Sequence, residues 1–164
     1  WRILFVRRWR TYRVGGCIMS LTSQLMARIN HRLQNNLVIA GEIVATEIRR
    51  SINKAPRGGK TYTLTNPNRV HKASAAGEPP ATDLGFLVRS IQTEPDLDNL
   101  RVRILSLHSI APYAKRLEFG DMSRNLQPRP FMQRGLQTQR QKAINIVQRA
   151  VSQAMRDMQG ANIR

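Results

Sequence analysis

The strongest constraint on the fold is a stripe of apolar residues in the first third of the chain. It recurs every three to four positions, at Leu21, Leu25, Ile29, Leu33, Leu37, Ala40, Val44 and Ile48. This spacing predicts one long helix over roughly residues 21–52, with polar residues on its other faces. Pro56 and the pair Gly58-Gly59 end it.

A second stripe predicts another long helix near the end of the chain. It begins near Pro130 and continues through Ala143, Ile146 or Val147, Ala150, Ala154 and Met158. Between the two helices, β-branched and aromatic residues over 61–65 predict a strand, and 69–72 is its returning partner. Asn66-Pro67-Asn68 is the turn signal between them.

The remaining segments predict short elements. Thr82 or Asp83 caps a short helix that runs to about Ile91, and residues 95–99 break it. The alternating pattern from Leu100 to Ile104 predicts a strand. Residues 73–80 are an ordered irregular loop. Pro112 and Gly120 bracket a two-turn helix.

Together these elements predict one α+β domain over residues 19–164: a long N-terminal helix, a small mostly antiparallel sheet with short helices, and a long C-terminal helix. Residues 1–18 differ in composition, with both tryptophans, the only cysteine and five arginines. We interpret them as a non-native or disordered leader before a natural start at Met19; the alternative is a basic N-terminal arm.

The charge is strongly lopsided. The chain has 27 Lys and Arg against 10 Asp and Glu, a formal +17. Such a surface attracts polyanions, most obviously nucleic acid; the alternative is a solvated basic exterior. The longest apolar runs, 3–6 and 37–40, are far shorter than a bilayer span, so we expect no membrane partner.

No residue pattern predicts an enzyme. Gly58-Gly59-Lys60-Thr61 resembles the end of a phosphate-binding loop, but Lys54 stands where the first glycine belongs. The three histidines, His31, His71 and His108, lack metal-ligand spacing. Ser74, His71 and Asp83 could form a nucleophilic triad on paper, and Glu78 could pair with Asp83 as acid and base. Neither arrangement has a supporting signature.

Two stretches carry patterns that composition does not explain. The first, from His71 to Ile91, contains Gly77, Glu78, Pro79 and Pro80. The second contains Tyr113-Ala114-Lys115-Arg116-Leu117-Glu118-Phe119-Gly120 and is followed by Arg129-Pro130-Phe131.

In order and spacing, these stretches resemble the family of tailed-phage neck and tail-completion proteins, often catalogued as gene-ten-product-like or as minor tail protein Z. Its members carry an Ala-Ser-x-x-Gly-Glu-Pro-Pro-Ala loop before a Gly-x-Leu-x-x-Ser-Ile helix. A Tyr-Ala-x-x-Leu-Glu-Phe-Gly turn and an Arg-Pro-Phe opening of the last helix follow. The resemblance covers roughly Leu21–Met158; Leu84 stands where threonine or serine is common, and the Gly120–Pro128 loop is short.

The resemblance implies a virion component at the head–tail junction or tail top, made in the bacterial host cytoplasm. It implies a ring of identical copies that contacts connector, tail terminator or tail-tube proteins, with no cofactor and no catalytic residue. The basic surplus would face the channel through which DNA passes. The alternative function is sequence-independent binding of nucleic acid, without base-specific contacts.

The residues themselves suggest how the motifs act. Glu118 and Arg129 could form a charge-assisted pair that ties the short helix to the last one; the alternative is that Glu118 offsets Lys115 and Arg116 at the surface. Phe119 and Phe131 would fill the core beside this pair. Gly77 suits a positive φ, and Pro79-Pro80 hold an extended path. We expect residues 73–81 to form a pre-ordered assembly contact.

Overall fold

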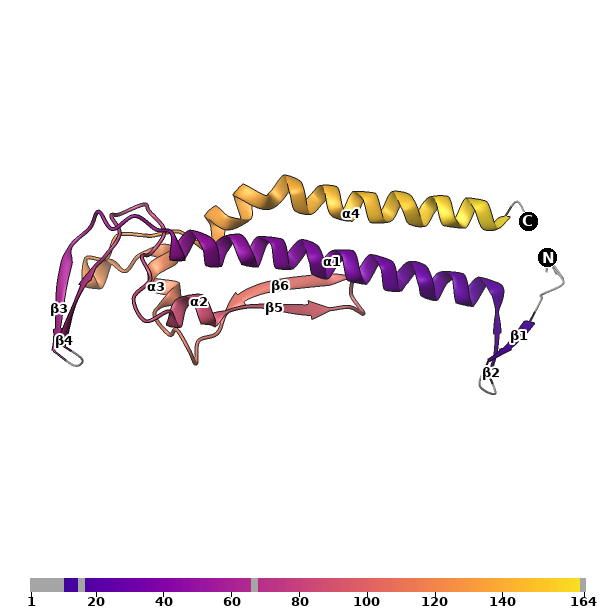
Figure 1. The fold of residues 1–164 in the computed structure, drawn as a ribbon, viewed down its shortest axis with the longest axis horizontal. Helices are drawn as coiled ribbons and strands as arrows, with labels where there is room; N and C mark the ends of the chain where they lie inside the picture. The colour runs from indigo at the N-terminus through magenta and orange to yellow at the C-terminus, as the bar shows by residue number, and fades with distance from the viewer. Residues whose placement is uncertain (1–10, 15–16, 66–67, 163–164) are drawn as a thin grey trace.

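The long helix α1 (Leu21–Asn53) is the central element of the molecule. The structure, a computed structural model, describes residues 11–14, 17–65 and 68–162. In Figure 1, the second long helix, α4 (Met132–Asn162), lies along one side of α1 and the hairpin of β5 and β6 along another. α4 runs antiparallel to α1, and an ion pair of 2.5 Å between Arg32 and Asp157 joins the first half of α1 to the last part of α4.

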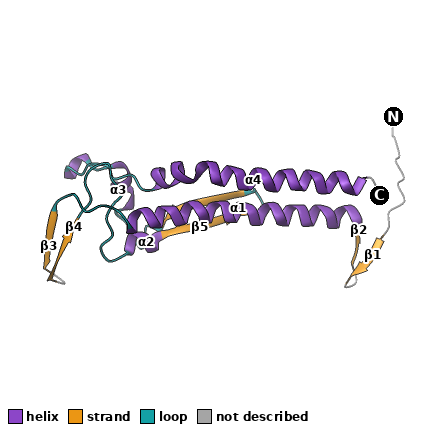
Figure 2. Cartoon of the chain, turned by 45° about the horizontal axis from the view of Figure 1, so that its top comes forward, coloured by secondary structure: helices purple, strands orange, loops and turns teal. Residues whose placement is uncertain are grey.

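The strands form two-stranded antiparallel hairpins. β1 (Thr11–Val14) pairs with β2 (Cys17–Ser20), β3 (Thr61–Thr65) with β4 (Asn68–Lys72), and β5 (Ile91–Asp96) with β6 (Arg101–Ser106). The α+β class is therefore confirmed, but the strands of the described residues are divided among three hairpins and do not join into one sheet. Figure 2 shows β1–β2 and β3–β4 at opposite ends of an elongated molecule.

The structure corrects one predicted helix. Residues 82–91 form only the short helix α2 (Phe86–Ser90), and Ile91 already begins β5. Neither Thr82 nor Asp83 caps α2, since its N-cap is Gly85 at φ 76° without a side-chain hydrogen bond. Pro95 lies inside β5 opposite Val102. A proline is tolerated there because a two-stranded hairpin leaves one edge of each strand unpaired.

The short helices lie close to the start of α4. α3 (Ala114–Phe119) begins two residues after Pro112 and ends before Gly120, which adopts φ 80°. A short 3-10 helix, η1 (Met122–Arg124), follows. The predicted turn residues Asn66 and Pro67 lie outside the described residues, as do residues 1–10 and 15–16 of the predicted leader.

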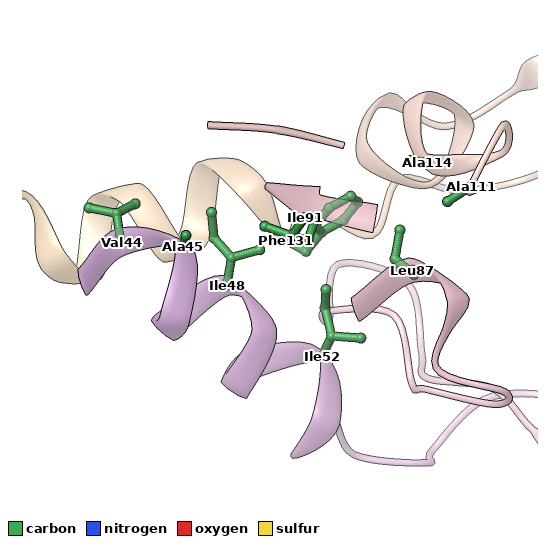
Figure 3. Close-up of a cluster of buried hydrophobic side chains, with 9 residues drawn as sticks. All are labelled: Val44, Ala45, Ile48, Ile52, Leu87, Ile91, Ala111, Ala114 and Phe131. Carbon is green, nitrogen blue, oxygen red and sulfur yellow. The ribbon is translucent and has the colours of Figure 1, made fainter. Parts of the chain in front are cut away.

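The core joins α1 to α2, β5, α3 and the start of α4. Figure 3 shows its buried members, which are Val44, Ala45, Ile48, Ile52, Leu87, Ile91, Ala111, Ala114 and Phe131. Further along the two long helices, Ile29, Ala40, Ala150 and Ala154 are buried as the predicted stripes require. Within the described residues, no helix is long and apolar enough to cross a membrane.

Candidate assembly site

Glu118 connects α3 to the beginning of α4. Its carboxylate accepts the backbone N–H groups of Phe131, Met132 and Gln133 at 2.8, 3.0 and 3.0 Å. The first N–H groups of a helix have no partner inside the helix, and the positive end of the helix dipole favours a negative charge. The sequence Arg129-Pro130-Phe131 offers no serine, threonine, asparagine or aspartate as a local cap, so Glu118 supplies the cap from another element.

The predicted ion pair between Glu118 and Arg129 is wrong. Among the described residues, no salt bridge joins these side chains, because the carboxylate is engaged by backbone N–H groups. The Arg129 Nε donates instead to the carbonyl of Ser74 at 3.3 Å, and its backbone N–H donates to the carbonyl of Leu117 at 2.7 Å. The two segments are tied together as expected, but each residue uses a different partner.

The two phenylalanines of the motifs have opposite environments. Phe131 is 1% exposed and belongs to the core, as predicted. Phe119 is 74% exposed, so its predicted core position is wrong. Adjacent helical residues point about 100° apart. Because Glu118 points to the start of α4, its neighbour Phe119 faces solvent, and Gly120 then turns the chain away.

The proline loop packs against the same region. Gly77 adopts φ 78°, as predicted, and its N–H donates to the carbonyl of Pro128 at 2.9 Å. The Glu78 carboxylate accepts the N–H of Ala75 at 3.0 Å, which closes the loop, and both Pro79 and Pro80 are buried. The loop motif and the Arg-Pro-Phe motif, far apart in sequence, therefore meet.

A hollow of about 370 Å³ lies between the proline loop, α2 and α3; we call it the α2–α3 hollow. Six of the residues that line it are His71, Ser74, Asp83, Leu87, Tyr113 and Arg129. Asp83 pairs with Arg69 at 2.5 Å, and the Nδ1 of His71 lies 3.7 Å from the Asp83 carboxylate. Burial, and to a lesser degree the charge of Asp83, raise the pKa of Tyr113 above its usual 10.0.

Ser74, His71 and Asp83, the three residues considered as a nucleophilic triad, all line the hollow, but they are not arranged as a triad. The Ser74 hydroxyl is fully buried and, within the described structure, has no hydrogen-bond partner, so His71 is not placed to take its proton. Glu78 is turned to Ala75 and does not line the hollow with Asp83. In the part of the chain that the structure describes, no three His, Cys, Asp or Glu residues are grouped as metal ligands.

The glycine-lysine-threonine segment has the wrong neighbours for a phosphate-binding loop. α1 precedes it and β3 follows it, as the sequence predicts, whereas that loop requires a strand before and a helix after. Gly59 instead packs against the backbone of Ser74, where a Cβ atom would lie 2.2 Å from the Ser74 carbonyl oxygen. This segment is a structural contact between the β3–β4 hairpin and the proline loop.

No family of known proteins, no curated protein and no solved structure matches the chain.

Proposed function

We propose that this protein is a structural component of a tailed-phage or prophage particle that forms a ring at the head–tail junction or tail top. Its partners are copies of itself and the neighbouring connector, tail terminator or tail-tube proteins. It is made in the host cytoplasm, has no cofactor, and acts by assembly without catalysing a reaction. The proposal starts from the four motifs that resemble the neck and tail-completion family.

The observation that carries the proposal is the meeting of these motifs at the foot of α4. Residues 73–81 contact Pro128 and Arg129, and Glu118 caps the helix that follows. Each of these hydrogen bonds has a backbone N–H or carbonyl group as at least one of its two partners. The motif residues therefore act as a frame that sets the direction of α4, which is a structural purpose and needs no substrate.

The surface of α4 supports assembly. Besides the stripe buried against α1, α4 carries apolar side chains that are each more than one-third exposed: Leu136, Ile144, Val151, Met155 and Met158. At 100° per residue these five share one flank of the helix, beside the buried stripe. Gln133, Gln137 and Arg140 are exposed on the same flank, so its surface is mixed. Exposed apolar side chains gathered on one flank are typical of a surface that contacts another protein.

The test is the oligomeric state of the purified chain. We expect sedimentation velocity to show one closed oligomer that persists at high salt, and electron microscopy to show rings, because apolar contacts are not screened by ions. A monomer at all accessible concentrations, which also fails to join particles that lack this protein, would overturn the proposal.

A second candidate is sequence-independent binding of nucleic acid. Arg134, Lys142, Arg149 and Arg156 are spaced by eight, seven and seven residues, so they share one face of α4. No ion pair within the described residues engages any of them. At 1.5 Å per residue, they extend over about 33 Å, close to one turn of B-DNA.

Salt dependence distinguishes the two candidates. If the free chain binds duplex DNA, the logarithm of the binding constant falls with the logarithm of salt by about 0.9 per contacted phosphate. Replacing the four cations with glutamine would then reduce the slope by about four units and leave any ring intact. Tight, steeply salt-dependent binding by a monomer favours the second candidate, whereas a salt-resistant ring with weak binding favours the first.

A further inference from the structure

One residue of the α2–α3 hollow is a cation without a countercharge. The Arg129 side chain is half-buried, and its Nε donates to the Ser74 carbonyl at 3.3 Å. Among the described residues, no carboxylate lies within ion-pair distance of its guanidinium. Removing a charge from water without pairing it is unfavourable, so this position is suited to an anionic group from outside the chain.

The other charges around the hollow do not supply that group. Asp83 is already paired with Arg69 at 2.5 Å and lies 3.7 Å from His71. The hollow thus keeps a surplus of one positive charge at Arg129. Leu84 and Phe86, both about half exposed, add apolar surface to its lining, and the Arg89 guanidinium lies 4.8 Å from the centre of the Phe86 ring. The matching partner is a carboxylate flanked by apolar side chains.

The chain itself carries such a group at the turn between β5 and β6. Asp98 is exposed and stands between Leu97 and Leu100, two of the exposed large hydrophobic residues. All ten acidic residues lie in the described part of the chain, and nine of them have a partner there. Six are in ion pairs, and Glu78, Asp96 and Glu118 accept hydrogen bonds. Asp98 is the exception.

Two hydrogen bonds to the Leu97 carbonyl stabilise the backbone of the turn. The Leu100 N–H donates to the Leu97 carbonyl at 3.3 Å, and the Gln34 side chain of α1 donates to the same carbonyl at 3.2 Å. Leu100 adopts φ 48°, a conformation that is unusual for a bulky residue and often marks a functional position. The backbone of the turn is therefore fixed before it meets a partner, which lowers the entropy cost of docking.

The turn and the hollow cannot meet within one molecule. β5 leads away from α2 for six residues, a distance of about 20 Å. Figure 1 accordingly places the β5–β6 turn well away from α2 and α3. A contact between them joins two different faces of two copies, and a repeated contact of this kind closes into a ring or continues as a filament.

We propose that the β5–β6 turn of one copy docks into the α2–α3 hollow of the next, with the Asp98 carboxylate paired to Arg129 and the two leucines against the apolar side chains of its lining. This inference rests on the proposed ring formation and identifies one contact between neighbouring copies, in addition to the apolar flank of α4. The occupant is a second copy, because the chain presents both complementary charges, and neither is in an ion pair within the described residues.

Charge reversal tests the pair in the full-length chain. Asp98→Arg should raise the concentration needed for half-assembly at least about tenfold, because it places two cations together in a desolvated contact. Glu94→Arg makes an equal change of charge on the same hairpin and also breaks the Glu94–Arg103 ion pair, yet it should leave assembly unchanged because Glu94 lies outside the turn. Combining Asp98→Arg with Arg129→Glu should restore assembly in part. Equal assembly by the Asp98 and Glu94 variants would overturn the proposed contact.

A cross-link keeps the test independent of stability effects at Arg129. In a Cys17→Ser background, Leu84→Cys together with Leu100→Cys should give a ladder of covalent oligomers after mild oxidation. Either cysteine alone should give none. A ring that forms without the ladder, or that forms with Asp98→Arg at the same concentration as with the unchanged chain, overturns the contact and leaves the proposed function standing. If the unchanged chain forms no ring, ring formation fails and the contact fails with it.

Discussion

The carboxylate of Glu118 accepts the backbone N–H of Phe131 at 2.8 Å, although the two residues are thirteen positions apart. The same carboxylate accepts the next two N–H groups of α4. α4 lacks a cap of its own, so its starting point depends on α3 being folded and in place. A change at Glu118 should therefore loosen α3 and α4 together.

Glu118→Ala should lower the free energy of unfolding by about 2–3 kcal/mol, since it removes a helix cap and three charge-assisted hydrogen bonds. Glu118→Gln should cost roughly half as much, because it keeps an acceptor and loses the charge. Urea denaturation followed by circular dichroism measures both. Glu94→Ala, which removes an exposed carboxylate and its surface ion pair with Arg103, is the control. The capping role would be refuted if Glu118→Ala were no more destabilising than this control.

Truncating Phe131 and truncating Phe119 to alanine should have very different effects on the free energy of unfolding. Phe131→Ala leaves a cavity in the core and should lower the free energy of unfolding by about 3–5 kcal/mol. Phe119→Ala removes a side chain that is already in water and should change it by less than about 0.5 kcal/mol. Thermal unfolding of the two variants in parallel provides the comparison. Similar losses would mean that Phe119 is covered in the folded chain.

The long helices could be predicted from the sequence because their stripes follow a local rule. Ile29, Ala40 and Val44 are buried where a 3.6-residue period places them. β5 was missed for a different reason. Pro95 indicates a break when read alone, and only its position opposite Val102 in an isolated hairpin makes it compatible with a strand.

The site was predicted in part. The sequence brought Glu118, Arg129 and Phe131 together correctly, because two motifs flank one short loop. The sequence did not show that the Glu118 carboxylate would accept backbone N–H groups of α4, because this depends on the position of the first turn of α4 relative to α3 in the folded chain. A usable signal was present: the last helix opens without a local capping side chain, so an acidic residue from a nearby element is the natural candidate.

Tyr113 should titrate at a higher pH than a free tyrosine. Burial, followed by the negative charge of Asp83, raises its pKa above 10.0. A raised pKa in the folded state means that the phenol stabilises the fold fully below pH 10 and that this contribution is lost as the pH rises through the folded pKa. Absorbance at alkaline pH should show a late-titrating component. Tyr113→Phe should remove it, and Asp83→Asn should move it part of the way down. An unchanged curve for Tyr113→Phe would contradict the assignment.

Two glycines of α4 should respond in opposite directions to the same substitution. A Cβ atom on Gly135 would lie 2.4 Å from the Cγ1 of Ile48 and 3.2 Å from its Cα, so α4 would have to move away from α1. Gly135→Ala should therefore lower the free energy of unfolding by about 1–3 kcal/mol, as overpacking does in cores. A Cβ atom on Gly160 would have no atom within 4 Å.

Gly160→Ala is thus the matched control, and it should be neutral or stabilising by up to about 1 kcal/mol because alanine favours the helix. Both variants add one methyl group to the same helix. The higher helix propensity of alanine therefore stabilises both of them, and the contact with Ile48 is the difference between the two. Combining Gly135→Ala with Ile48→Ala, which removes the Cγ1 that the new Cβ would meet, should recover little of the cost of Gly135→Ala when the reference is Ile48→Ala alone, since the Cα and N of Ile48 lie at 3.2 and 3.3 Å. Full recovery in that double variant would show that the side chain alone, and not the close approach of the two helix backbones, sets the position of α4.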